Sequence, residues 1–355
     1  MSLSGGVKRI IDDAIDRIVH VKKRLVINHD YWRVDQFINA LPKVYIYDLP
    51  DKFKPSHRLS LVSETYFALY DFFRLYCQTD DPQKAEYFFV PLNIIQYQFR
   101  NENPYGVLKY LNYFDPLHHN HLLIALGDYS QRSKKNHFGH AYLETYTWLN
   151  DFVLLALEST SDLIPEHDIG IIPYNTLSTK PEFNKNKRPY LYSFIGEISH
   201  SYLPNNHIRN QMGAIPLKKD IFIASRLNNN QRKELINNYY TQNDYELVAR
   251  NSLFTLAPAG FGRWTYRFFQ AIQWGSIPVL LSDDYIKPFE DSIPYDDFCI
   301  TIPEKDITRI DEILRSFSPY DVMRLQDALE NNLHHFTQTG FFYKLCNRLK
   351  LQIKH

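Results

Sequence analysis

Hydrophobic residues in the first half of the chain form short apolar runs, separated by stretches in which apolar positions recur three and four residues apart. Short runs rich in β-branched and aromatic residues predict buried strands, and the wider spacing predicts helices. The expected strands are residues 43–49, 86–91, 122–126 and 168–173. The expected helices are residues 63–77, 81–85 and 142–158.

This pattern restarts after a polar, lysine-rich stretch at residues 175–188, which we interpret as a linker. Strands are then expected at residues 189–196, 221–223, 253–256, 277–281 and 298–302, and helices at residues 266–274, 307–316 and 321–333. Strands that alternate with helices predict parallel sheets joined by right-handed crossovers. The sequence therefore predicts two α/β halves, with a ligand at the carboxyl ends of the strands, between the halves.

The N-terminal region predicts an amphipathic helix, because isoleucine and valine recur at helical spacing among charged residues at positions 7–27. This pattern differs from that of a signal peptide. The helix either packs on the body of the protein or lies on a membrane surface, since its polar face carries several Lys and Arg. No apolar run in the sequence reaches the ~20 residues that span a bilayer.

The charge balance and the cysteines narrow the class of protein. Among 355 residues, 40 Lys and Arg balance 40 Asp and Glu, so the chain has no basic field to hold a nucleic acid. The 3 cysteines, Cys77, Cys299 and Cys346, are far apart, which argues against a disulfide framework or a zinc site and favours a reducing compartment. The aromatic content of 15% supports two cores, and tyrosine also suits sugar binding.

The strongest chemical signal is the strand–loop–helix segment at residues 253–270. Gly260 and Gly262 permit an unusual loop, and Thr265 is the expected N-cap of a helix whose first amides favour an anion. Arg263 and Arg267 add positive charge at the same end, and an arginine can bind a phosphate through two hydrogen bonds. The spacing indicates a diphosphate site, and the alternative is a structural turn with surface arginines. A P-loop is excluded, because no Gly-Lys-Ser/Thr follows.

A second candidate lies where the predicted strand at residues 277–281 ends, at Asp283 and Asp284. Carboxylates at a strand's carboxyl end suggest a metal ion. Adjacent carboxylates on a strand point apart, however, so a role in a loop or a cap is favoured and no metal site is predicted.

Several ordered blocks make the chain similar to one known family. The C-terminal family signature reads approximately S-x-F-C-L-x-P-x-G, S-x-R-x-x-E-A, G-x-I-P-V and D-x-x-x-P-F. The matching residues here are Ser252, Phe254, Leu256, Pro258, Gly260, Arg267, Ala271, Gly275, Ile277, Pro278, Val279, Asp284, Pro288 and Phe289. Further blocks are VYIYDLP at 44–50, DPQKAEYFFVPL at 81–92, DIGIIPY at 168–174, SFIG at 193–196 and Ile208-Arg209. The chain thus resembles the exostosin family of glycosyltransferases over about residues 43–314.

That resemblance implies an α/β fold of the GT-B type, with two Rossmann-like domains facing a central cleft. It implies an acceptor-side domain at residues 1–175, including the leading helix, and a nucleotide-sugar domain at 176–318. Helices at 319–355 would pack back on the first domain.

The resemblance also implies transfer from a UDP sugar to a glycan acceptor, with inversion and with neither metal nor other cofactor. The residues that it assigns to the donor are Arg209, Pro258, Gly260, Arg263, Thr265, Arg267 and Gln270.

Two departures from the family pattern bear on activity. Gln270 stands where the family has Glu, and Asn136 replaces the Asp of an Asp-His-Phe block. His137 in that block is the candidate catalytic base, because a histidine titrates near neutral pH. Other candidates are His140, Asp48, Glu64 and Glu197 at strand or helix ends.

These departures leave alternatives open: a non-catalytic carbohydrate- or nucleotide-binding protein that keeps the fold, and a sugar-nucleotide epimerase. The sparse cysteines and the lack of an apolar anchor predict a cytoplasmic protein of bacterial or viral origin, with peripheral membrane contact as an alternative.

Overall fold

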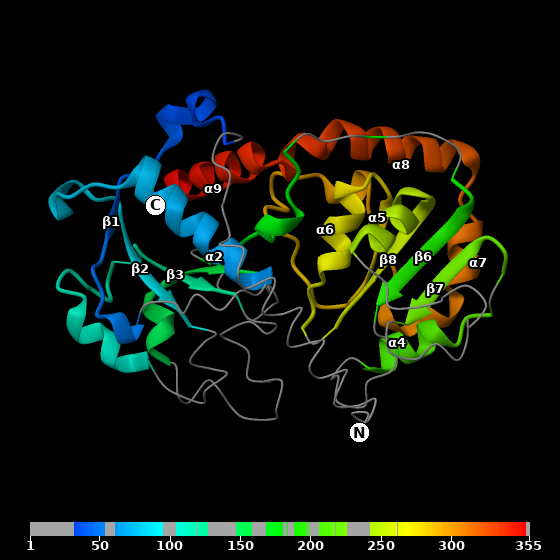
Figure 1. The fold of residues 1–355 in the computed structure, drawn as a ribbon, viewed down its shortest axis with the longest axis horizontal. Coiled ribbons are helices and arrows are strands. Elements are labelled where there is room, and N and C mark those ends of the chain that lie inside the picture. Colours follow the sequence, from blue (N-terminus) through cyan, green and yellow to red (C-terminus); the bar gives the residue numbers. More distant parts are fainter. Residues whose placement is uncertain are drawn as a thin grey trace, which may run out of the picture.

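A computed structural model of the chain describes residues 32–53, 61–94, 104–118, 120–126, 147–157, 168–179, 183, 188–196, 198, 206–216, 218–225, 242–260 and 262–352. Within these residues the chain forms two five-stranded sheets in which every pairing is parallel. Figure 1 shows the two sheets in separate halves of the molecule. The expected mixed α/β class with two parallel sheets is therefore confirmed.

The first sheet has its strands in the order in which they occur in the sequence. They are β1 (Val44–Ile46), β2 (Tyr87–Asn93), β3 (His121–Ala125), β4 (Val153–Ala156) and β5 (Ile169–Gly170). Around them lie α2 (Leu61–Phe72), which continues as η4 (Phe73–Cys77), and the short helices η3 (Asp51–Phe53), η5 (Pro82–Lys84), η6 (Pro104–Tyr110) and η7 (Thr147–Asp151). β3 and β4 are buried along their whole length, which explains their apolar runs.

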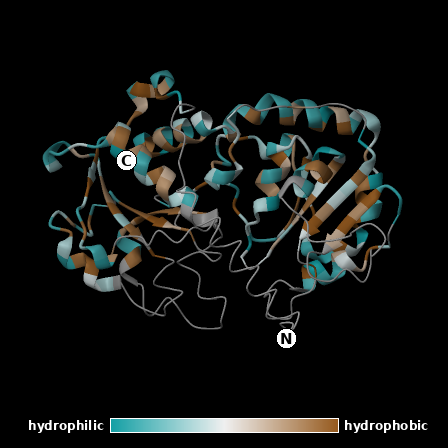
Figure 2. Ribbon diagram, in the orientation of Figure 1, coloured by the Kyte–Doolittle hydropathy of each residue, from teal (hydrophilic) through white to brown (hydrophobic). Residues whose placement is uncertain are grey.

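The second sheet has the order β10-β9-β8-β6-β7. Its strands are β6 (Tyr190–Gly196), β7 (Ile221–Ser225), β8 (Ser252–Pro258), β9 (Ile277–Leu281) and β10 (Ile300–Thr301). Its helices are α4 (Asn206–Gly213), α5 (Gln242–Arg250), α6 (Tyr266–Gln273) and α7 (Ile310–Arg315), with η10 (Tyr295–Asp297) and η11 (Glu304–Arg309). The core residues of α4 and α7 pack on one face of this sheet, and those of α6 belong to the core on the other face. Figure 2 shows strands that are mostly hydrophobic and outer helices in which hydrophilic and hydrophobic residues alternate.

The halves are connected by η8 (Tyr174–Thr176) and by the C-terminal run of α8 (Pro319–Asn332), η12 (Leu333–Phe336) and α9 (Gln338–Gln352). η8 contacts both α2 and α6. α8 packs on β9, and η12 leads into α9. α9 lies against the first half, where it contacts η2 (Val34–Ala40), and its Phe342 ring stacks on Phe72 with centroids 4.0 Å apart. The Tyr87 hydroxyl donates a hydrogen bond of 2.7 Å to the Leu349 carbonyl of α9.

One expected helix is wrong. Residues 142–158 were expected to be helical, but residues 147–151 form η7 and residues 153–156 form β4. A short, wholly apolar run fits a buried strand as well as a buried helix, and the pairing of β4 with β3 decides between them. The amphipathic helix expected at residues 7–27 lies outside the described residues. α4 and α5 were not expected, because their apolar positions are few, whereas α8 and α9 fall within the C-terminal helices expected at residues 319–355.

No helix in the described part of the chain is long and apolar enough to cross a membrane. Cys77, Cys299 and Cys346 are free and buried.

Candidate functional site

The strand order of the second sheet reverses between β6 and β8. The next strand in the sequence after β6, β7, lies on one side of β6, whereas β8, β9 and β10 follow on the other side. Counted from β6, the order of the sheet is the doubly wound order 2-1-3-4-5, whose ligands bind at the carboxyl ends of the strands where the order reverses. The strands β6 and β8 pair as far as Ser193 and Thr255. Beyond this pair, β6 continues to Gly196 and β8 to Pro258. Backbone groups at these strand ends are therefore available to side chains from the following helices.

The loop after β8 leads into the N-terminus of α6. Thr265 is the N-cap, as expected, and its hydroxyl accepts a hydrogen bond of 3.3 Å from the Arg267 amide. Within the loop, the Gly260 amide donates to the Gly262 carbonyl at 3.0 Å. A Cβ atom at Gly260 would lie 2.8 Å from Arg209 Nη2, so any larger residue here would displace that guanidinium. Pro258, at the end of β8, is buried and pairs with Leu281.

Arg267 lies in the first turn of α6 and reaches back over the reversal point. Its Nε donates a hydrogen bond of 2.9 Å to the Ile195 carbonyl, and its Nη1 donates to Gln270 Oε1. The guanidinium also lies over the Tyr245 ring of α5, 3.8 Å from the centroid. Burial, with a smaller contribution from the nearby positive charge of Arg209, lowers the pKa of Arg267 to about 10. No carboxylate among the described residues pairs with Arg267.

Arg209 approaches the same point from α4. Its Nε donates a hydrogen bond of 3.0 Å to the Ala259 carbonyl, and its guanidinium lies 5.8 Å from the centroid of the Phe194 ring. Arg209 and Arg267 come from helices that follow two different strands, and they repel each other electrostatically. The fold thus brings two guanidinium groups together at the strand-order reversal, beside the N-terminus of α6, which is the positive end of the helix dipole.

Among the described residues, Arg263 is paired with a carboxylate and Arg267 is not. It forms an ion pair with Glu304, which also contacts His207 Nε2 at 3.1 Å. Glu304 in turn donates its amide to Asp283 Oδ1 at 2.8 Å. The charge of Arg263 is therefore compensated, and Asp283 caps the start of η11, which agrees with the loop or cap role expected for it. In the described part of the chain, no group of three metal-ligating side chains is present.

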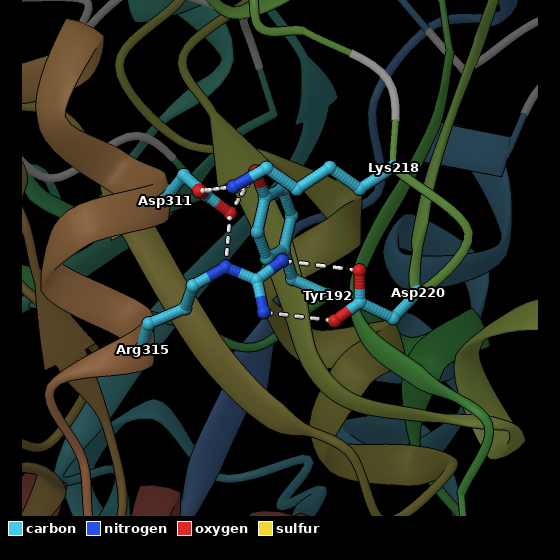
Figure 3. A network of polar contacts seen from close by, with 5 residues as sticks. All are labelled: Tyr192, Lys218, Asp220, Asp311 and Arg315. Carbon is cyan, nitrogen blue, oxygen red and sulfur yellow. Dashed lines mark hydrogen bonds and ion pairs between the residues drawn. The ribbon is translucent and has the colours of Figure 1, made fainter.

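The polar network in Figure 3 shows how this chain normally pairs an arginine. Arg315 donates to Asp311 at 2.9 Å and to Asp220 at 2.9 and 3.0 Å, and these carboxylates raise its pKa. Asp311 also accepts hydrogen bonds from Lys218 at 2.5 Å and from the Tyr192 hydroxyl at 3.3 Å. These groups lie near the amino ends of β6 and β7, whereas Arg209 and Arg267 lie near the carboxyl ends of the strands. By contrast, the pKa of Arg267 is lowered because burial is not offset by a carboxylate.

The structure brings together six of the donor residues inferred from the resemblance: Arg209, Pro258, Gly260, Thr265, Arg267 and Gln270. Tyr245 was missed, because α5 was not expected. The spacing of Tyr245, Val248 and Ala249 is a weak helical signal that could have indicated it. His137, Asn136, His140 and Glu197 lie outside the described residues.

Two parallel sheets, the second in the doubly wound strand order, define a protein of the α/β class. Residues 38–317 match the model of the exostosin GT47 domain, and the chain belongs to that family. Plant relatives bear the names of glycosyltransferases, and the chain is a glycosyltransferase.

Among the relatives, an exostosin-1 homologue of Caenorhabditis elegans is 25% identical over 81% of this chain and 79% of its own length. A probable glucuronosyltransferase of Oryza sativa subsp. japonica is 40% identical over 24% of this chain and 20% of its own. A probable β-1,4-xylosyltransferase of Arabidopsis thaliana is 39% identical over 24% of this chain and 21% of its own.

A solved α-glucosyltransferase in complex with UDP-glucose and DNA is also similar, with 13% identity, coverage of 90% of this chain and 94% of that one, and a TM-score of 0.38. Because this TM-score is low, we assign the fold of the present chain from its own strand order.

Proposed function

We propose that this glycosyltransferase moves a sugar from a UDP-sugar donor to a hydroxyl group of a glycan acceptor, with inversion at the anomeric carbon. The observation that carries the proposal is the Arg267 guanidinium, which has lost much of its contact with water and has no carboxylate partner among the described residues. A buried charge is costly unless a ligand or a side chain compensates it. A diphosphate supplies the opposite charge, and the positive end of the α6 helix dipole adds to the attraction.

The same residues support a transfer that needs no metal ion. When the bond between the sugar and the distal phosphate breaks, negative charge develops on the phosphate oxygen. Arg267, Arg209 and the N-terminus of α6 stabilise that charge by hydrogen bonds that exist before the reaction. Gln270 holds Nη1 of Arg267 and can accept a hydrogen bond from the donor ribose, without the charge of the family's Glu. Activity is therefore expected to be the same with EDTA and with added Mg²⁺.

Binding of the nucleotide can be tested by the melting temperature with and without UDP. A ligand that binds only the folded state stabilises it by about 2.7 kcal/mol at roughly 100 times its Kd. Arg267→Ala is expected to abolish this shift. Arg309→Ala is the matched control, because Arg309 is an exposed arginine that is ion-paired on the surface with Glu312 and Asp306. An undiminished shift in Arg267→Ala would refute the phosphate assignment.

The second candidate function is a non-catalytic protein that binds nucleotide or carbohydrate. Gln270 and Asn136 favour it, because each replaces a carboxylate of the family pattern. Release of UDP distinguishes the two functions. The names of the plant relatives make UDP-glucuronic acid and UDP-xylose the first donors to test. A UDP-induced thermal shift without release of UDP from either donor would favour the binding protein.

We further propose a cytoplasmic location, which the three buried free thiols support.

A further inference from the structure

An inverting transfer needs a base that removes the proton of the acceptor hydroxyl as the new bond forms. The donor residues cannot supply it, because Arg209 and Arg267 are cations and Gln270 carries no charge. The base must come from a residue facing the donor site, and a carboxylate in the described part of the first half fits this requirement. It is Glu64, in the first turn of α2.

The position of this turn is fixed by contacts at the junction of the two halves. Thr65, next to Glu64, accepts a hydrogen bond of 3.0 Å from the Tyr174 amide, and this contact is buried. Tyr174 begins η8, which follows the carboxyl end of β5 and contacts both α2 and α6. In Figure 1 the first turn of α2 points to the middle of the molecule, while the rest of the helix runs away over the first sheet. Glu64 therefore lies on the side of the first half that meets α6.

The surroundings of Glu64 leave its carboxylate available. The side chain is half-buried, and its neighbour Thr65 is fully buried. Over the part of the chain that the structure describes, Glu64 forms neither an ion pair nor a hydrogen bond. Burial raises the pKa of the Glu64 carboxyl above its ordinary value, which makes its carboxylate a stronger proton acceptor.

Elements at the junction also present polar atoms that are buried without a partner. Tyr66 Oη on α2, Asn175 Oδ1 on η8 and Trp264 Nε1 before α6 have no hydrogen-bond partner among the described residues. Such atoms are uncommon in folded proteins and mark places where water or a ligand completes the hydrogen bonding. A sugar, with its many hydroxyl groups, has the matching chemistry.

We propose that Glu64 is the general base of the transfer, a step that rests on the function proposed above. The Glu64 carboxylate takes the proton from the acceptor hydroxyl while that oxygen bonds to the anomeric carbon. The bond from the anomeric carbon to the distal phosphate oxygen breaks, and its electron pair leaves with UDP, held by Arg267 and Arg209. The base and the leaving-group site thus come from opposite halves of the molecule, so that a sugar between them can be attacked on the face opposite its leaving group, as inversion requires.

The test uses azide, an anionic nucleophile that has no proton to lose. Release of UDP from UDP-glucuronic acid and UDP-xylose is measured in water and in sodium azide, for the native protein, Glu64→Gln and Glu312→Gln. Glu312 is an exposed glutamate on α7 and serves as the matched control. Glu64→Gln is expected to release UDP into water at least ~100-fold more slowly than the native protein. In azide it should form glycosyl azide at a rate within about threefold of the native rate, because no base is then needed. Glu312→Gln should match the native protein in both.

Three outcomes would overturn the assignment. Unchanged hydrolysis by Glu64→Gln shows that another group is the base. If the rate in water and the rate in azide fall by the same factor, while the UDP-induced thermal shift is unchanged, Glu64 has a structural role in the site and is not the base. If the native protein shows neither UDP release nor a UDP-induced shift, the proposed function itself fails, and this inference fails with it.

Discussion

Replacing Arg267 by methionine is expected to stabilise the protein in the absence of ligand while it destroys the donor site. The guanidinium is held at the strand-order reversal by neutral partners alone: the Ile195 carbonyl, Gln270 and the Tyr245 ring. A site built to receive a diphosphate keeps this charge uncompensated, at a cost in stability. Methionine has a similar length, and its sulfur packs well against an aromatic ring.

The expected gain follows from the pKa of the side chain. A decrease from 12.5 to about 10 corresponds to a cost of roughly 3 kcal/mol for the charged form. Arg267 keeps part of its exposure, so screening by solvent reduces this cost to about 2 kcal/mol. Loss of the hydrogen bonds to the Ile195 carbonyl and to Gln270 together subtracts about 1 kcal/mol, at the low end of the usual range. The net expectation is a variant more stable by about 1 kcal/mol.

Thermal unfolding followed by circular dichroism, without nucleotide, measures this difference. A gain of this size raises the melting temperature by roughly 2 °C in a chain of this length. UDP should no longer raise the melting temperature of the variant. If Arg267→Met instead melts clearly below the native protein, the guanidinium is a structural brace, and its interpretation as a charge awaiting an anion is wrong.

Two further predictions concern stability. His121 is buried, its Nε2 lies 2.9 Å from the Tyr47 hydroxyl, and burial lowers its pKa from 6.5 to about 4. The unfolded chain therefore takes up a proton near pH 6.5 that the folded chain takes up only near pH 4, so stability is lost as the pH falls through this window. The loss from this group between pH 7 and pH 5 is about 2 kcal/mol. Urea unfolding at both pH values should show a smaller loss in the double variant Tyr47→Phe/His121→Phe, and an equal loss would exclude His121 as the source. Ser318 forms a capping box with Asp321 at the start of α8, and Ser318→Ala should cost about 1 kcal/mol in urea unfolding. A cost near zero would show that the cap does not contribute.

The sequence by itself determined the features that depend on near neighbours. Apolar runs identified most strands, because a strand of a parallel sheet is buried on both faces and so has a continuous apolar sequence. Thr265 was identified as the N-cap of α6, because capping involves only the next few residues. The ordered motifs identified the family. Residues 153–156 show the limit of this reasoning, since their apolar run fitted two kinds of element and only pairing with β3 selected the strand.

Only the tertiary structure decided which charges are compensated. Arg263 and Arg267 are neighbours in the same loop and helix start, and the sequence assigned them the same role. Glu304, far along the chain, pairs with Arg263, whereas Tyr245 from an unexpected helix covers Arg267. The order of the strands likewise places α4 and α6 beside one reversal point, so that Arg209 meets Arg267 there. Local patterns carry no record of such encounters, because they depend on how the sheets and helices pack in three dimensions.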